Sequence, residues 1–369
     1  MEFNPSPGPT VGVEWELQLL DSFTLDLVDG IMPLMEFFPN TEFVKPEYIQ
    51  SCVELTSCVA ENSAEATAHI QGSLTKILQR CGELEMDACA SGTHPFCRRL
   101  ALITPLPRYQ RIEKDAGFLA HTQITFSSHV HIGMTSGDEA MRVISLLAPA
   151  LPAFIALSAN SPFWRGHETG HAAYRHRILA AAPNYSLPPR MRTWGEFADF
   201  MNAGRRANMV HSIKDIHWNI RPHPDFGTIE IRAMDAASDL RTLQALVAFA
   251  RALVLCLRDA SSEDVATILP LELPDWIAKE NHFRAAHLGL AADYIVDVKG
   301  NLRPLRELIA DLIEFCGPTA ADVGESKGLE LTEYLLTGGA GYERQLQSYE
   351  ESHSAQSVVK MLTKALRPT

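Results

Sequence analysis

The sequence has no C-x-x-C pair, although it contains seven cysteines. An odd number of cysteines without paired spacing argues against both a disulfide framework and a zinc ribbon. We therefore expect reduced, mostly buried thiols in a cytoplasmic protein. The seven positions are Cys52, Cys58, Cys81, Cys89, Cys97, Cys256 and Cys316.

Basic residues are too few to balance the acidic ones. The 32 Lys and Arg residues stand against 45 Asp and Glu residues, which gives a formal charge of −13. Proteins that bind nucleic acids usually carry a basic patch, so this balance argues against a general nucleic-acid binder. The acidic charge alone identifies no partner.

Several familiar motifs are also missing, which argues against the sites that they build. There is no G-x-x-x-x-G-K-[ST] loop, no G-x-G-x-x-G fingerprint and no G-x-S-x-G elbow in the sequence. The first residues lack a basic stretch followed by an apolar core, so we expect no secretory signal.

One uncharged stretch, residues 143–164, is long enough to be compared with a membrane span. It contains Pro149, Pro152 and Pro162, and its strongly apolar part ends at Leu157. We therefore predict a buried helix that ends in a polar loop, within a soluble protein.

With 369 residues, of which 46% are hydrophobic, the chain can bury a large core without disulfides or a structural metal. No internal repeat and no long flexible linker divides it. We therefore predict a single domain over residues 1–369.

Helices are predicted where a capping residue precedes apolar residues at helical spacing. Pro149 should disturb the second of these helices. The last seventy residues read as helical throughout. The four capped helices are expected to start at Asn62, Asp138, Thr193 and Asp239, and the first to end near Cys81.

Five short runs alternate apolar and polar residues, as strands with one buried face do. The last two runs flank a turn-rich segment and are predicted to form a β-hairpin with a seven-residue loop. The polar positions are Glu14 and Glu16 in residues 11–20, Glu54 in 52–56, His129 and His131 in 123–134, Asn219 and Arg221 in 217–221, and Glu230 and Arg232 in 229–233.

For any one of these strands, the outer face of a half-exposed sheet would explain the pattern. Together the five runs contain no Lys, which a solvated face would be expected to carry. The predominance of carboxylates favours Mg²⁺ or Mn²⁺ over zinc, and the Arg residues suggest an anionic ligand. The two His residues could share a metal or could be packed in the core. The residues alone support a metal-dependent phosphoryl transferase.

Seven blocks of the sequence occur in the order typical of one family. With them, the chain resembles the bacterial carboxylate–amine ligases related to type 2 glutamate–cysteine ligase. The resemblance covers about residues 11–300 and leaves a helical part over about residues 301–369. The blocks are GVEWELQLLD, VELTSCV, GTHPF, HVHIGM, IALSANSPFWRGHETGHAAYRHRI, HWNIRPHPDFGTIEIRAMD and ENHFRAAHLGL.

The resemblance implies an α+β, glutamine-synthetase-like catalytic domain, in which a curved antiparallel β-sheet with flanking helices holds ATP and Mg²⁺, with Mn²⁺ as the alternative ion. The implied reaction begins when ATP phosphorylates a carboxylate to an acyl phosphate. An amine then attacks the acyl phosphate to give an amide and free phosphate. The substrates would be a small carboxylate such as glutamate and an amine, with cysteine as one candidate.

The resemblance also implies roles for individual residues. The metal ligands would be Glu14, Glu16, Glu54, His131 and Glu230. The catalytic group would be Glu230, Arg232 and His131, with His129 in a supporting role. Nucleotide or substrate anions would be bound by Arg221, Asn219, Arg177 and Arg232, with Arg284 as the weakest candidate.

A reactive acyl phosphate must be kept from water, so a loop that closes over the site is expected. We place this loop at residues 165–176, with Gly166 and Gly170 as hinges, and an ordinary surface connection as the alternative.

Two other functions stay open on the sequence alone. His-x-His on a strand also occurs in metal-dependent amidohydrolases, and a ligase-like protein could bind ATP or an amino acid without turnover. The apolar helices are compatible with a homodimer, although such helices pack equally well inside a monomer. No nucleic-acid or membrane partner is expected.

Overall fold

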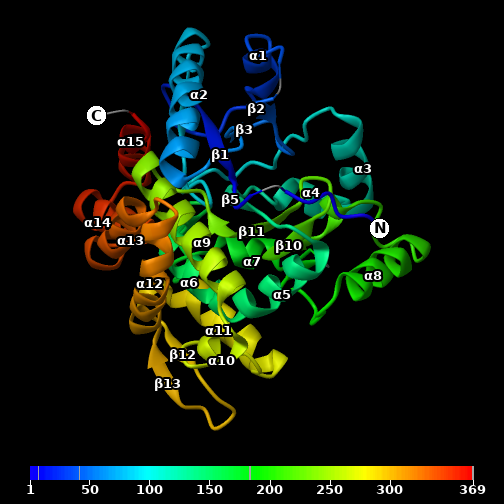
Figure 1. Ribbon diagram of the computed structural model, residues 1–369. Helices are drawn as coiled ribbons and strands as arrows, with labels where there is room; N and C mark the ends of the chain where they lie inside the picture. Colours follow the sequence, from blue (N-terminus) through cyan, green and yellow to red (C-terminus); the bar gives the residue numbers. More distant parts are fainter. Residues whose placement is uncertain (7, 41, 183, 368–369) are drawn as a thin grey trace.

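A seven-stranded antiparallel β-sheet forms the centre of the computed structural model, which describes residues 1–6, 8–40, 42–182 and 184–367 (Figure 1). Six strands follow the order β10-β11-β5-β1-β3-β2, and β4 pairs with the second half of β1. The strands are β1 (Val11–Asp21), β2 (Val44–Pro46), β3 (Cys52–Thr56), β4 (Met86–Cys89), β5 (Ser127–Gly133), β10 (Ile220–His223) and β11 (Thr228–Asp235).

Three two-stranded pairs lie outside the central sheet. They are β6 (Phe163–Trp164) with β7 (His167–Glu168), β8 (Tyr185–Ser186) with β9 (His217–Trp218), and β12 (Asp293–Ile295) with β13 (Leu302–Pro304). The β8–β9 pair is parallel, and the other two are antiparallel.

Helices make up most of the remaining described structure. Those before residue 220 are α1 (Ile31–Met35), α2 (Ser63–Glu83), α3 (Pro107–Ala116), α4 (Phe118–Thr122), α5 (Gly137–Leu147), α6 (Leu151–Ser158), α7 (Arg175–Leu179) and α8 (Trp194–Arg206). Those after it are α9 (Leu240–Asp259), α10 (Ser262–Ala266), α11 (Asp275–Leu288), α12 (Leu305–Asp322), α13 (Ser326–Gly338), α14 (Gly341–Ser352) and α15 (Ala355–Leu366). Short 3₁₀ turns cover Ala148–Ala150, Ile213–Asp215 and Gly289–Ala291.

Most of the predicted helix starts are confirmed. The side chains of Asn62, Thr193 and Asp239 accept hydrogen bonds from the first turns of α2, α8 and α9. Pro149 falls in the 3₁₀ turn that separates α5 from α6, as expected for a residue that cannot donate within a helix. After residue 300, the short strand β13 precedes the predicted helices.

The N-cap of α5 is Ser136, so the prediction of Asp138 was wrong. The Ser136 hydroxyl accepts the Glu139 N–H at 3.1 Å, from an extended backbone conformation that suits a cap. Asp138 lies in the first helical turn, and its carboxylate accepts the N–H of Trp194 at 2.8 Å.

The β10–β11 hairpin has a tighter turn than predicted. Pro222 pairs with Ile229 and His223 with Thr228, which leaves residues 224–227 as a four-residue loop instead of seven. Pro222 is tolerated in a strand because β10 lies at the edge of the sheet. The predicted strand over 217–221 is divided at Asn219 between β9 and β10.

The two faces of the sheet differ in chemistry, as the alternation predicted. Trp15 on β1 is fully buried beneath helices, and its indole N–H donates to the carbonyl of Ala237 at 2.9 Å. Helices α2, α9 and α6 pack against β1, β5 and β11. The acidic and His residues of the same strands therefore project to the other face.

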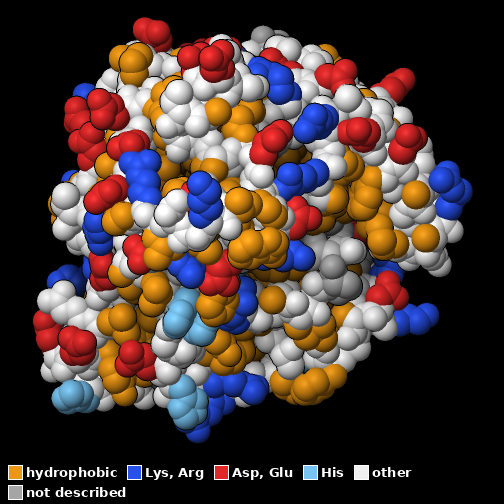
Figure 2. Space-filling view, turned by 90° about the horizontal axis from the view of Figure 1, so that it is seen from below, with side chains coloured by type: hydrophobic (Ala, Val, Ile, Leu, Met, Phe, Trp, Pro, Cys, Tyr) orange, Lys and Arg blue, Asp and Glu red, His pale blue; other side chains and the backbone are white. Residues whose placement is uncertain are grey.

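Two stretches, 137–158 and 240–259, have the length and apolar character of a membrane span. Within them, 78% and 83% of the most apolar windows are buried in the protein, which identifies them as core helices. On the face drawn in Figure 2, acidic and basic side chains are interspersed with apolar ones, and no sign of charge dominates it. All seven cysteines are free thiols, and six of them are buried.

His94, in the loop after β4, is a neutral histidine enclosed by the fold. Its side chain is 1% exposed, with Nε2 2.9 Å from the Leu25 carbonyl oxygen and Nδ1 accepting the Cys97 N–H at 3.0 Å. Burial lowers the pKa of His94 to about 4.

We expect the free energy of unfolding to fall between pH 7 and pH 5, partly because of His94. In the unfolded chain this histidine takes up a proton near pH 6.5, whereas the folded protein resists protonation until about pH 4. The contribution is about 2 kcal/mol at pH 5, from roughly 1.36 kcal/mol per pKa unit. Urea unfolding of His94→Asn at both pH values should show a smaller loss than the wild type.

His211, which is exposed at the surface, provides the matched control. His211→Asn should lose as much stability between pH 7 and pH 5 as the wild type. Equal losses in His94→Asn and in the wild type would contradict the assignment.

Candidate active site

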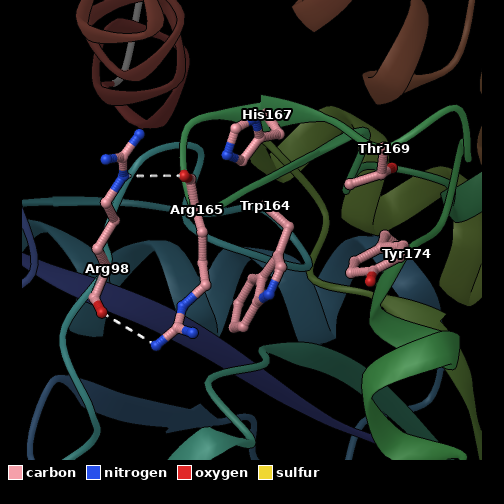
Figure 3. Close-up of a pocket in the computed structure, with 6 residues that line it drawn as sticks. All are labelled: Arg98, Trp164, Arg165, His167, Thr169 and Tyr174. Carbon is pink, nitrogen blue, oxygen red and sulfur yellow. Dashed lines mark hydrogen bonds between the residues drawn. The ribbon is translucent and has the colours of Figure 1, made fainter.

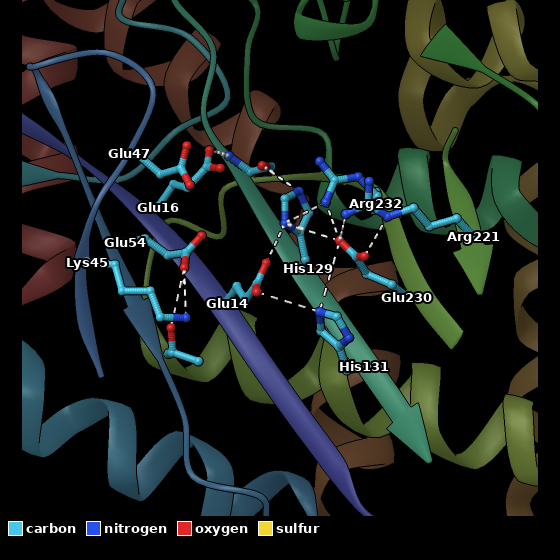
Figure 4. A network of polar contacts seen from close by, with 12 residues as sticks. Glu14, Glu16, Lys45, Glu47, Glu54, His129, His131, Arg221, Glu230 and Arg232 are labelled. Carbon is cyan, nitrogen blue, oxygen red and sulfur yellow. Dashed lines mark hydrogen bonds and ion pairs between the residues drawn. The ribbon is translucent and has the colours of Figure 1, made fainter. Parts of the chain in front are cut away.

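A cavity of about 680 Å³ covers the polar face of the sheet. Side chains from β1, β3, β5, β10 and β11 project into it, so that residues far apart in the chain meet (Figure 4). The predicted residues that line it are Glu14, Glu16, Glu54, His129, His131, Arg221, Glu230 and Arg232.

The strand register brings Glu14, His131 and Glu230 together. His131 on β5 pairs with Glu230 on β11, while Glu14 on β1 lies opposite His129, two residues before His131. One ligand atom from each of Glu14, His131 and Glu230 lies within 4.8 Å of the others. These three residues form a cluster of the size that one metal ion requires.

His131 has one ring nitrogen committed and one unpartnered. Its Nδ1 lies 3.0 Å from the Thr228 hydroxyl, which fixes the orientation of the ring. Its Nε2 is buried and has no hydrogen-bond partner among the described residues, and it lies 3.6 Å from Glu14 Oε1 and 4.0 Å from Glu230 Oε1. A buried nitrogen aimed between two carboxylates fits a cation, and two carboxylates with one imidazole suit Mg²⁺ or Mn²⁺.

His129 supports this cluster from the side. Its Nδ1 lies 3.0 Å from Glu14 Oε2, and its Nε2 lies 2.8 Å from the Ser127 hydroxyl. Burial, together with the charge of Arg232, lowers the pKa of His129 to about 4, so the ring is neutral near pH 7. Burial alone would raise the pKa of Glu14, but the hydrogen bond with His129 and the nearby ring of His131 hold it well below its ordinary value.

Glu230 is held by two arginines. Arg221 donates to both carboxylate oxygens, from Nε at 2.7 Å and from Nη2 at 3.2 Å, and Arg232 donates to Oε1. Burial alone would raise the pKa of Glu230, but the charges of the two guanidinium groups lower it well below its usual value. Glu230 is therefore ionised at neutral pH.

All three side-chain nitrogens of Arg221 donate hydrogen bonds to protein groups. Its Nη1 donates to the carbonyl oxygens of Ile213 and Ile216, at 2.9 and 2.5 Å. These bonds and the pair with Glu230 use its donors within the protein. Arg232 is less engaged, and its guanidinium borders the cavity beside His129. Of the two arginines, Arg232 is the one placed to meet a bound anion.

A second acidic group lies at the other side of Glu14. Glu16 and Glu54 are cross-strand neighbours, and Glu47 faces the same cavity. Burial and the charge of Glu47 raise the pKa of Glu16 to about 8, and burial with the charges of Glu14 and Glu47 raises that of Glu54 well above its ordinary value. Lys45, whose Nζ lies 3.4 Å from Glu54, offsets part of this charge. A bound cation would stabilise the ionised forms of all three carboxylates.

Three of the predicted anion-binding residues lie away from this cavity. Asn219 is buried with its amide against His282, and Arg177 packs over the ring of Phe283 at 5.2 Å. Arg284 pairs with Glu280 along α11 at 2.8 Å. None of the three is among the residues that line the cavity.

Arg175 is a site residue that the sequence reasoning missed in favour of Arg177. It begins α7, is 4% exposed and lines the cavity. Within the part of the chain that the structure describes, its buried Nε and Nη1 have no hydrogen-bond partner, and neither has the Nε2 of Gln123, which also lines the cavity. Side chains two positions apart on a helix point in nearly opposite directions. A predicted helix over residues 175–179 would therefore have placed Arg175 and Arg177 on opposite faces.

A family model described as glutamate-cysteine ligase family 2 matches residues 10–361 of the chain. A protein of Trichormus variabilis, provisionally named glutamate–cysteine ligase 2, is 40% identical over 366 residues, which cover 99% of this chain and 95% of that protein. A similarly named protein of Thermobifida fusca is 33% identical and covers 100% of this chain and 93% of its own length.

Two solved structures share the fold at low sequence identity. Glutamate–cysteine ligase of Francisella tularensis, in complex with AMP, superposes with a TM-score of 0.66 at 10% identity, over 99% of this chain and 90% of that one. A bifunctional glutathione synthetase of Pasteurella multocida gives 0.64 at 13% identity, over 96% and 52%. The predicted α+β fold, an antiparallel sheet with flanking helices, is therefore confirmed.

We expect Glu14→Gln to weaken the binding of Mn²⁺ about 100-fold, because the variant loses a charged oxygen of the three-residue cluster. Electron paramagnetic resonance of free Mn²⁺ measures the affinity without any substrate. Glu330→Gln removes the same charge from an exposed helix and should bind as the wild type does. Equal affinities in the two variants would rule out Glu14 as a ligand.

Proposed function

Because the chain belongs to glutamate–cysteine ligase family 2, we propose that it is an ATP-dependent ligase that joins a carboxylate to an amine through an acyl phosphate. The observation that carries the proposal is the buried cluster of Glu14, His131 and Glu230, with Arg232 beside it on the wall of one cavity. This arrangement combines a divalent-cation site with a cationic group for the transferred phosphoryl.

Glu14, Glu230 and His131 would hold Mg²⁺, and Glu16 and Glu54 would contribute to a further ion beside them. When bound there, Mg²⁺ would supply neutralisation of the negative charge of the phosphate groups. The protein holds these ligands in place before substrates bind, through the contacts of His129 and Arg221. Mn²⁺ fits the same ligands.

Arg232 is the group best placed to stabilise the transition state. Its guanidinium is oriented by Glu230 and lies at the cavity wall, so it costs little reorganisation when negative charge develops on the phosphoryl oxygens. Arg221 acts through Glu230, because its own donors are used within the protein.

Arg175 and Gln123 would recognise the carboxylate substrate. Among the described residues, Arg175 Nε and Nη1 have no acceptor, which is costly for buried donors, and a carboxylate can satisfy two of them at once. A substrate with two carboxylates, such as glutamate, could be held by one at Arg175 while the other is presented to ATP. The names of the relatives make glutamate and cysteine the first pair to test.

The proposed reaction has two steps. A carboxylate oxygen attacks the γ-phosphorus of ATP, the bond to the β-phosphate oxygen breaks, and ADP leaves. The amine nitrogen then attacks the acyl carbon, loses a proton, and expels free phosphate to leave an amide. Water must be kept from the acyl phosphate. The loop predicted for this, residues 165–176, contains Gly166 and Gly170 at φ 82° and 70°, and its last two residues are buried in α7.

We propose that the enzyme works in the cytoplasm, where its seven free thiols would stay reduced. That the protein forms a homodimer stays a prediction.

Phosphate release from Mg-ATP, with glutamate and a panel of amines beginning with cysteine, tests the proposed function. Release should require both substrates, and mass spectrometry should identify the amide. We expect Arg232→Ala to lower kcat about 100-fold, because it removes a preorganised donor to the transition state. Arg284→Ala, which removes a half-buried arginine outside the cavity, is the control.

Amide hydrolysis without ATP would favour an amidohydrolase. Nucleotide binding without phosphate release across the panel would favour a ligand-binding homologue without turnover. Either result would overturn the ligase assignment.

Arg175→Ala should raise the KM for the carboxylate substrate about tenfold or more, since charge-assisted hydrogen bonds to a substrate are lost. Arg177→Ala, two residues away, should change this KM by less than about threefold, because Arg177 packs over Phe283 and does not line the cavity. Steady-state kinetics at saturating ATP measure both. The reverse order of effects would return the role to Arg177.

A further inference from the structure

A second cavity of about 520 Å³ lies outside the catalytic one and shares no lining residue with it. Its wall is formed by the β6–β7 hairpin, by the loop after β4 and by the residue before α7 (Figure 3). The lining residues are Arg98, Trp164, Arg165, His167, Thr169 and Tyr174, and none of them is acidic. The whole chain has a net charge of −13, so a cavity lined by two arginines and no carboxylate is a local concentration of positive charge on an acidic protein.

The two arginines hold each other in place, and each uses one side-chain N–H donor to do so. Arg98 Nε donates to the Arg165 carbonyl at 3.1 Å, and Arg165 Nη2 donates to the Arg98 carbonyl at 3.0 Å. Each guanidinium has five N–H donors, so several remain for a ligand. Among the described residues, neither arginine forms an ion pair with a carboxylate within 4.0 Å.

The backbone at Arg165 also points to a function. Trp164 pairs with His167, so Arg165 and Gly166 form a two-residue hairpin loop, with φ of 54° and 82°. A loop with two positive φ values is a type I′ turn, whose first position favours Asn, Asp or Gly. An arginine in this left-handed conformation is disfavoured by its Cβ, and such outliers gather at functional sites.

Aromatic side chains complete the cavity. The rings of Trp164 and Tyr174 lie 6.4 Å apart, centroid to centroid, and provide flat walls opposite the arginine pair. Guanidinium groups match the planar geometry of a carboxylate, and aromatic rings pack against a flat amide or aromatic body.

We propose that this cavity is a second anion-binding site, which takes a small carboxylate such as the C-terminal end of an amino acid or short peptide. Arg98 and Arg165 bind the carboxylate, and Trp164 and Tyr174 pack against the body of the molecule. Binding at this site can be measured without turnover, so this proposal and the proposed ligase function can fail separately.

The test uses N-acetylglycylglycine as the anionic probe and N-acetylglycylglycinamide as a neutral probe of the same size. Titration of the full chain should change the fluorescence of Trp164, and Trp164→Phe should remove that change. The neutral probe should bind about tenfold more weakly or worse, since it lacks the charge that the arginines recognise. Calorimetry provides the affinity independently of the fluorophore.

Arg165→Asn separates binding from folding. Asn suits the first position of a type I′ turn, so the variant should unfold at an equal or higher temperature than the wild type. Its affinity for the anionic probe should nevertheless fall about tenfold, as should that of Arg98→Ala. Unchanged affinity in both variants, or no binding of the anionic probe to the wild type, would overturn the proposal.

Further measurements identify the kind of molecule that carries the carboxylate into this cavity. Tighter binding of inorganic phosphate than of the peptide anion would overturn the preference for carboxylates. If the cavity holds the acceptor amine, Arg98→Ala should raise only the KM for that amine. If it holds an effector, the acetylated peptide, which has no free amine, should change kcat in the wild type and not in Arg98→Ala.

Discussion

Burying several carboxylates on one face of a sheet is the constraint on which the rest of this molecule depends. Glu14, Glu16, Glu54 and Glu230 come from the strands β1, β3 and β11, and each charge removed from water must be offset by a partner. Glu230 has two arginines, Glu54 has a lysine, and Glu14 has two histidines beside it. The incomplete compensation at Glu16 and Glu54, where the pKa values are raised, is what a divalent cation would correct. The helices on the opposite face keep the strands rigid enough to maintain this arrangement.

Much of this site could be predicted from the period-two alternation of the strands, because a strand places every second residue on the same face. The alternation could not determine the register, and the register is what brings Glu230 beside His131 and separates Asn219 from the cavity. Arg175 was missed for a related reason: the choice between it and Arg177 depends on the phase of a five-residue helix. From the sequence, Asp138 was a plausible N-cap for α5, but the helix begins after Ser136, whose backbone dihedrals are extended. Local patterns therefore indicated the residues, and long-range pairing selected among them.

The two cavities are joined through one short segment of chain. Tyr174 lines the outer cavity and Arg175, the next residue, lines the catalytic one. The hydroxyl of Ser161 accepts the Arg175 N–H at 3.1 Å and donates to Asp235, at the end of β11, at 2.6 Å. The start of α7 is thus connected to the strand that carries Glu230 and Arg232. A molecule seated against Tyr174 would touch the segment that orients the cationic wall of the catalytic cavity.

The strand order also has a consequence for synthesis of the chain on the ribosome. β1 is made first, yet its neighbour β5 lies more than 100 residues later, and β11 pairs with β5 only after another 95 residues or so. Glu14 has no histidine partner until β5 has been made, and the arginines of β10 and β11 follow later still. Non-local pairing of this kind is slow, because long loops must close before any contact stabilises them. The polar face of β1 therefore lacks these partners in the nascent chain until β11 has emerged.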